Sequence, residues 1–142
     1  MTIEDISAQI IEEFSVFDEW LDKYEYLIEI GRQMPPLKPE ARIPENLIEG
    51  CQSRVWLDCE ERDGRLWFNA DSDAVITKGI ISLLIRVFDG QKPEDIVNAD
   101  LSFIDRIGLK DNLSPTRANG LSSMITKIKA YALAFSKKDE QN

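Results

Sequence analysis

Apolar and polar residues alternate along much of residues 53–71, and this is the clearest local pattern in the chain. Asp63 and Gly64 interrupt the alternation, and an Asp-Gly pair between two alternating runs is a strong signal for a β-hairpin. We predict strands over 53–61 and 65–71, with Cys59 opposite Phe68. One face of the hairpin is then apolar: Val55, Leu57, Cys59, Leu66, Phe68 and Ala70. Because a two-stranded hairpin is marginal alone, we also expect a short third strand near residues 44–49.

Before the hairpin, apolar residues recur at helical spacing. They predict helices over about 3–14 and 17–33. Thr2 and Asp5 resemble a capping box at the start of the first helix, and Pro35 should end the second. Residues 35–49 carry three further prolines and no clear period. Such long irregular segments inside compact domains are often functional.

After the hairpin, we expect a buried central helix that runs to about Phe88 and is capped by Ser72 or Asp73. Two short helices should follow within residues 92–100 and 101–108. Ser114, followed by a proline, should cap a last helix over 115–136. The element order predicts one α+β domain over residues 1–142, with a small antiparallel sheet and about six helices. Residues 137–142 are expected to form a frayed tail.

The chain is acidic, with 142 residues and a formal net charge of −9. A protein of this charge is a poor candidate for binding nucleic acid or an anionic membrane, because both need a basic face. The longest apolar run, Ala74–Phe88, contains two basic residues and is too short to span a bilayer. The acidic N-terminus does not resemble a secretory signal. We therefore expect a soluble cytoplasmic protein.

The chain has two cysteines, Cys51 and Cys59, and no histidine. This set is too small for a disulfide framework or a four-ligand zinc site, and it excludes Ser-His-Asp and Cys-His catalysis within the chain. Cys59 lies in the middle of a strand on the apolar face. We interpret it as structural.

Cys51 is the candidate for chemistry, at the point where the irregular segment enters the first strand. A small buried hydrophobe and a nucleophile are both open interpretations. Gly50 permits unusual backbone angles, and Gln52 and Ser53 bring polar groups to the start of the strand. In an extended chain Cys51 shares its parity with Val55. We therefore expect its thiol to face the core at rest and to need a loop movement for presentation.

Asp71, Asp73 and Arg117 are further candidates for chemistry. The two aspartates suggest a carboxylate pair or metal ligands, but the favoured interpretation is that Asp73 caps a helix and that Asp71 is a solvated strand end. Arg117, early in the last helix, is either a surface arginine or a group that binds an anion or a partner.

The chain contains three segments whose order and spacing match a known family: EGCQSRVWL (49–57), DSDAVITKG (71–79) and LSPTRANGL (113–121). A fourth, DKYEYLIEIGRQMPPL (22–37), also fits. Together they resemble SufE, the sulfur-acceptor protein of iron–sulfur cluster assembly, over about residues 10–135. The resemblance implies an α+β fold like that of the IscU scaffold. It does not distinguish SufE from its close paralogue CsdE, which serves a different desulfurase.

The resemblance implies that Cys51 is the sulfur acceptor, because it occupies the cysteine position of the Gly-Cys-Gln-Ser motif. It would take persulfide sulfur from a cysteine desulfurase of the SufS or CsdA type, stimulate that enzyme, and pass the sulfur to a SufBCD-type scaffold complex. The chain would be a carrier rather than an enzyme, without a cofactor of its own, because PLP belongs to the desulfurase. Whether it forms a homodimer stays open. The residues expected to support the loop or dock the partner are Gly50, Gln52, Ser53, Asp73 and Arg117.

Three other functions remain as alternatives, and one of them is a purely structural adaptor in which Cys51 has no chemical role. A scaffold that assembles a cluster directly needs three or four ligands, usually thiolates, and the chain has two cysteines. A thiol peroxidase or redox sensor would use Cys51 as a sulfenate, with Arg54 or Arg117 as the activating cation.

Overall fold

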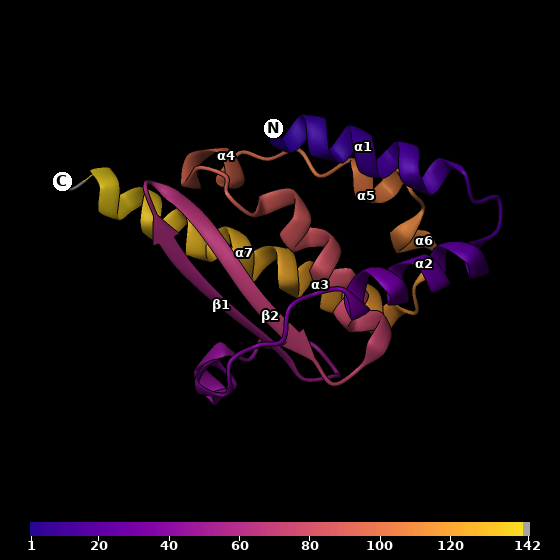
Figure 1. Cartoon of the computed structure of the whole chain (residues 1–142), viewed down its shortest axis with the longest axis horizontal. Coiled ribbons are helices and arrows are strands. Elements are labelled where there is room, and N and C mark those ends of the chain that lie inside the picture. Colours follow the sequence, from indigo (N-terminus) through magenta and orange to yellow (C-terminus); the bar gives the residue numbers. More distant parts are fainter. Residues whose placement is uncertain (141–142) are drawn as a thin grey trace.

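Figure 1 shows the computed structural model of the chain, which describes residues 1–140 and the side chains up to Lys137. A two-stranded antiparallel sheet packs with helices, so the predicted α+β class is confirmed. The N-terminal half contains helices α1 (Ile3–Ser15) and α2 (Trp20–Arg32), the 3-10 helices η1 (Pro39–Ala41) and η2 (Pro44–Asn46), and strands β1 (Val55–Arg62) and β2 (Arg65–Ser72). The C-terminal half contains α3 (Val75–Phe88), α4 (Pro93–Val97), α5 (Phe103–Arg106), α6 (Leu109–Asn112) and α7 (Pro115–Glu140).

Strands β1 and β2 pair in the predicted register, with Cys59 opposite Phe68. The turn residues Asp63 and Gly64 have φ values of 57° and 77°, as a two-residue hairpin of this type requires. β1 begins two residues later than predicted because residues 52–53 form a bend. The inner face is buried as expected, apart from the half-buried Cys59: Val55, Leu57, Leu66, Phe68 and Ala70.

The third strand predicted near residues 44–49 is wrong: the sheet in residues 1–140 has two strands. η2 occupies the start of this segment, and its first residue, a proline, has no N–H to give to a ladder. The segment forms only an isolated bridge between Leu47 and Trp56. Beside it, the Ile48 N–H donates to the Val55 carbonyl at 2.9 Å. This bridge closes the base of residues 49–53, which we call the Cys51 loop.

Helix α3 is the centre of the fold, and it contacts α1, α2, α7 and β2. Its crossing with α2 is close because both helices place a glycine there. A Cβ on Gly79 would lie 2.2 Å from the Leu27 carbonyl oxygen, and one on Gly31 would lie 2.8 Å from the Gly79 nitrogen. Neither position therefore tolerates a side chain at this separation. Nine residues of α3 are buried: Ile76, Thr77, Gly79, Ile80, Ile81, Leu83, Leu84, Val87 and Phe88.

Of the two N-terminal helices, α1 begins at the predicted residue and α2 begins later than predicted. The predicted capping box is present, because the Thr2 hydroxyl accepts from the Asp5 N–H while the Asp5 carboxylate accepts from the Thr2 N–H. α2 begins at Trp20, three residues later than predicted. Phe17 belongs instead to the connection between the helices, where its ring packs 5.3 Å from that of Tyr26.

Helix α7 lies behind the hairpin in Figure 1, and the Tyr131 hydroxyl donates to the Leu57 carbonyl of β1 at 3.3 Å. Its predicted cap is confirmed, because the Ser114 hydroxyl accepts from the Arg117 N–H at 3.3 Å. The helix runs to Glu140, four residues beyond the predicted end at about 136. The fraying of residues 137–140 stays a prediction. Residues 141–142 of the predicted tail lie outside the described residues.

The segment over 101–108 forms α5 and ends at Gly108, whose φ is 79°, and the short helix α6 that follows was not predicted. The buried apolar residues of the helices and the hairpin form one cluster. Within residues 1–140, no helix has both the length and the apolar character that crossing a membrane requires.

Candidate functional site

The Cys51 loop lies between β1 and α7, and the Cys51 side chain is half-buried. Its thiol packs against the apolar core and donates to the Gly120 carbonyl of α7, with Sγ 3.6 Å from the oxygen. The thiol thus faces inward, as its parity suggested. The backbone conformation behind this orientation differs from the extended one that the parity argument assumed. Residues 52–53 form a bend, and the strand does not reach back to Cys51.

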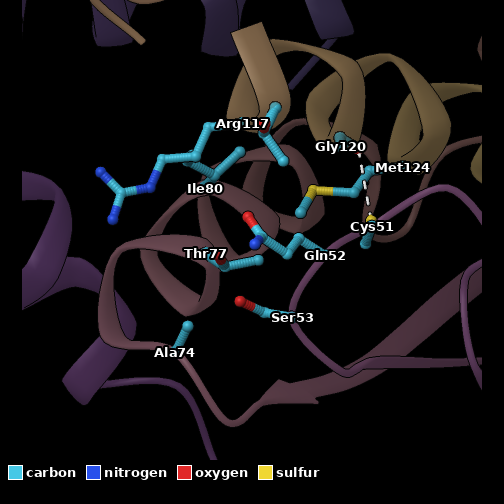
Figure 2. Close-up of a pocket in the computed structure, with 10 residues that line it drawn as sticks. Cys51, Gln52, Ser53, Ala74, Thr77, Ile80, Arg117, Gly120 and Met124 are labelled. Atoms are coloured by element: carbon cyan, nitrogen blue, oxygen red, sulfur yellow. Dashed lines mark hydrogen bonds between the residues drawn. The ribbon is translucent and has the colours of Figure 1, made fainter. Parts of the chain in front are cut away.

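A cavity of about 100 Å³ adjoins the thiol between the loop, α3 and α7 (Figure 2). A single water needs ~10–15 Å³ of such volume, so the cavity has room for several atoms beside Sγ. Its wall is partly apolar, from the buried Ile80 and Met124. The full lining is Cys51, Gln52, Ser53, Ala74, Thr77, Ile80, Thr116, Arg117, Gly120 and Met124.

The surroundings of Cys51 favour the protonated thiol. Burial raises the pKa of the Cys51 thiol above its ordinary value of 9.0, because desolvation disfavours the charged thiolate. Arg117 lines the same cavity, but its guanidinium group points away from Cys51 and donates to the Tyr24 hydroxyl of α2 at 3.3 Å. The chain has no histidine to act as a base. In this setting the thiol is held in its protonated, unreactive form.

Gly50 fits the loop against α7 through its backbone conformation and its lack of a side chain. Its φ of 90° lies in a region that other residues rarely adopt. A Cβ there would lie 2.4 Å from the Ser123 hydroxyl oxygen. A larger residue would require the Ser123 side chain or the loop to shift, and its backbone would be strained at this φ, which is a physical reason for glycine before Cys51.

Ser72 and Asp73 hold the C-terminal base of the loop rather than capping α3, and the predicted caps are wrong. The N-cap of α3 is Ala74, without a side-chain capping bond. The Asp73 carboxylate accepts from the Arg54 N–H at 3.0 Å, and the Ser72 hydroxyl donates to the Arg54 carbonyl at 2.8 Å. The Asp73 N–H donates to the same carbonyl at 3.2 Å. The Asp73 carboxylate is thus bound to Arg54, while the Ser72 hydroxyl both donates to Arg54 and accepts from the Ala74 N–H at 3.2 Å.

Asp71 was expected to be a solvated strand end, but its carboxylate is only 8% exposed. It forms ion pairs with Arg42 and with Lys78 of α3, whose Nζ lies 3.3 Å away. The Arg42 guanidinium also stacks over Trp56 at 5.1 Å. A buried carboxylate is stable only when it is paired, and here two cations pair with it. This ion-pair cluster, Arg42, Asp71 and Lys78, joins the irregular segment to β2 and α3.

Six residues were predicted to accept the sulfur, support the loop or dock the partner. The structure brings four of them to one cavity: Cys51, Gln52, Ser53 and Arg117. Gly50 lies beside it and contacts α7, while Asp73 lies at the base of the loop. Gly120, Met124 and Thr77 were missed as neighbours of the thiol. Gly120 belongs to the segment LSPTRANGL, and a glycine inside a predicted helix is the signal that would have marked it as a position of close approach.

Cys59 is a poor candidate for chemistry in its observed surroundings. Burial is the largest effect on its pKa, and the nearby carboxylates of Asp58, Asp89, Glu60 and Glu61 add to it, raising the value to about 12. Both cysteines are free thiols. The side chains that the structure describes include no group of three or more Cys, Asp or Glu residues that could hold a metal ion.

Known proteins resemble this chain in sequence and in fold. Residues 8–132 match the SufE family, described as an Fe-S metabolism associated domain. An uncharacterized SufE-like protein of Rhizobium meliloti (strain 1021) is 40% identical over 129 residues, which cover 87% of this chain and 92% of that protein. The solution structure of a hypothetical protein from Thermus thermophilus matches with a TM-score of 0.76 and 20% identity, covering 93% of this chain and 96% of the other. That likeness concerns the fold alone.

Proposed function

This chain belongs to the SufE family of Fe-S metabolism associated domains, and on that premise we propose that it carries sulfur on Cys51 for iron–sulfur cluster assembly. The donor is the persulfide of a cysteine desulfurase of the SufS or CsdA type, which this protein also stimulates. The acceptor is a SufBCD-type scaffold complex. The place of action is the cytoplasm, where free thiols such as these two persist.

The observation that carries this proposal is the setting of the Cys51 thiol. It lies on a short loop, half-buried, beside a cavity of about 100 Å³. The chain has no histidine to act as its base, and the Arg117 guanidinium, which belongs to the cavity lining, points away from Cys51. A thiol that must start a reaction alone needs a lowered pKa, whereas burial raises the pKa of Cys51. A carrier needs instead a thiol that is protected until it meets its donor and is activated by that partner. The setting of Cys51 meets that need.

The transfer step needs no oxidant or reductant. The Cys51 thiolate attacks the outer sulfur of the desulfurase persulfide, as in thiol–disulfide exchange. A new S–S bond forms on Cys51 while the S–S bond of the donor breaks, and the donor cysteine leaves as a thiolate that takes up the proton released by Cys51. Cleavage of the carbon–sulfur bond has already occurred on the PLP of the desulfurase.

The alternatives find less support. A redox sensor that forms a sulfenate needs an accessible thiol of low pKa, and burial acts on Cys51 in the opposite direction. Arg54 and Arg117 were the possible activating cations. Arg54 does not belong to the lining of the cavity beside the thiol, and the Arg117 guanidinium points away from Cys51 and donates to the Tyr24 hydroxyl. A cluster scaffold needs a set of ligands that the described side chains do not bring together.

The proposal is tested by incubating the protein with a SufS-type cysteine desulfurase and L-cysteine, followed by intact mass measurement without reductant. We expect a mass gain of one sulfur atom in wild type and in Cys59→Ser, and no gain in Cys51→Ser. Desulfurase turnover should rise on adding wild type and stay at its basal rate with Cys51→Ser. Equal loading of Cys51→Ser and wild type would contradict the proposal.

A further inference from the structure

The Cys51 loop is joined to other elements by very few polar contacts. Within residues 1–140, the bond from the Cys51 thiol to the Gly120 carbonyl is the one hydrogen bond that connects residues 49–53 to another element. The base of the loop is fixed on both sides, by the bond from Ile48 to Val55 and by the bonds at Arg54. The loop is therefore hinged at a fixed base, and its tip is held by a single S–H donor and by packing against the core and α7.

The other contacts at the tip are van der Waals contacts. Gly50 packs against Ser123 of α7, and Gln52 is exposed. In Figure 2 the dashed line from Cys51 to Gly120 spans the gap between the loop and α7, while the side chains of Gln52 and Ser53 point to the cavity. Among the hydrogen bonds of residues 1–140, only this one at the tip depends on whether Sγ carries a hydrogen.

Sulfur loading removes that hydrogen. In a persulfide, Sγ is bonded to a second sulfur instead of a proton, so it no longer donates to a carbonyl oxygen. The outer sulfur of a persulfide is more acidic than a thiol and is anionic at neutral pH. Neither sulfur atom can then donate a hydrogen bond to the Gly120 carbonyl oxygen, which is itself an acceptor. The cavity of about 100 Å³ has room for the added atom. The loss of the donor, rather than a clash, therefore shifts the equilibrium from the loop held against α7 to the released loop.

The geometry points to Gly120 as a positioning residue: its carbonyl holds the unloaded Cys51 loop against α7 and releases the loop once Cys51 carries sulfur. This inference rests on the proposed function, because it assumes that Cys51 becomes a persulfide. The unloaded thiol is shielded, and a desulfurase needs to break one weak hydrogen bond to reach it. The loaded form lacks that bond and presents its sulfur to the next acceptor.

The test is backbone ¹⁵N relaxation, which reports fast motion residue by residue. The heteronuclear NOE of Gly50, Gln52 and Ser53 is measured in reduced wild type and in Cys51→Ala, which lacks the donor. Cys51→Ser restores a donor, and Cys59→Ala removes the other thiol as a control. A fifth sample is wild type loaded by a desulfurase with L-cysteine. Unchanged spectra of the helices show that each variant is folded.

We expect the three loop residues to be as ordered as β1 in reduced wild type, Cys51→Ser and Cys59→Ala. Their NOE values should fall in Cys51→Ala and in the loaded protein. Equal order in Cys51→Ala and wild type would overturn the role of Gly120, whatever the desulfurase does. A loose loop in Cys51→Ala together with an ordered loop in loaded protein would overturn release by sulfur. Failure of the desulfurase to load wild type would count against the proposed function instead, and the Cys51→Ala comparison would still decide the role of Gly120.

Discussion

The substitution Asp71→Asn removes the charge from the centre of the ion-pair cluster and keeps the shape of the side chain. The Asp71 carboxylate is 8% exposed and pairs with Arg42 and with Lys78 at 3.3 Å. It also accepts from the Ser72 N–H at 2.8 Å. The amide can keep that hydrogen bond but loses both ion pairs. The change therefore isolates the electrostatic contribution of Asp71.

The magnitude follows from the distances and exposures. Two unit charges 3.3 Å apart attract by about 5 kcal/mol at an effective dielectric constant of about 20. Burying the carboxylate costs several kcal/mol, and the partners remain 41% and 29% exposed, so solvent screens both pairs. Breaking a fully buried pair costs about 3–5 kcal/mol. For Asp71→Asn we expect a loss of about 2 kcal/mol in the free energy of unfolding, because screening reduces the full value.

Urea denaturation of wild type, Asp71→Asn and Glu29→Gln measures this loss. Glu29→Gln is the matched control, because it makes the same kind of change in the surface pair with Arg32, where the side chains are 55% and 69% exposed. Its expected effect is below about 0.5 kcal/mol. Asp71→Asn should also speed alkylation of Cys51, since Asp71 adjoins the residue that holds Arg54. Equal stability losses in the two variants would refute the reasoning.

Three further predictions concern packing and protonation. Gly79→Ala should lower the free energy of unfolding by about 3 kcal/mol in urea denaturation, because its Cβ would lie 2.2 Å from the Leu27 carbonyl oxygen. A loss below about 1 kcal/mol would mean that α2 and α3 separate easily, against this prediction. The hydrogen bond from Arg86 lowers the pKa of Glu13 below 4.5, so its stabilisation is complete above pH 4.5 and is lost as the pH falls through the lowered pKa. Glu13→Gln should therefore destabilise the protein more at pH 7 than at pH 3, and equal losses at both would argue against it. Burial raises the pKa of Cys51, so the pH midpoint for its alkylation by iodoacetamide should be higher in folded than in urea-unfolded protein, and the reverse order would count against a shielded thiol.

The parts of the fold that depend on neighbouring residues were predictable from the sequence. The Asp-Gly turn sets the hairpin register, so the pairing of Cys59 with Phe68 followed from counting outward from the turn. The capping box of Thr2 and Asp5 likewise spans three residues. In both cases the partners are close along the chain, and the geometry of the turn or helix fixes how they meet.

The contacts that shape the site join residues far apart in the sequence. Gly120 lies 69 residues from Cys51, and Asp71 lies 29 residues from Arg42. No local pattern relates such pairs. Asp73 was predicted as a helix cap because aspartate before a helix usually is one, yet its carboxylate binds the Arg54 backbone instead. The same residue types fit both arrangements, and tertiary packing chooses between them.

Trypsin provides the most direct measurement of the central claim, because cleavage after Arg42, Arg54 and Arg62 places the two cysteines in different peptides. The protein is loaded by a desulfurase with ³⁵S-labelled cysteine, alkylated, digested without reductant and analysed peptide by peptide. Sulfur transfer to Cys51 predicts label and one added sulfur on the peptide over 43–54, and neither on the peptide over 55–62. Label on the peptide over 55–62, or on no peptide while the desulfurase turns over, would contradict the account.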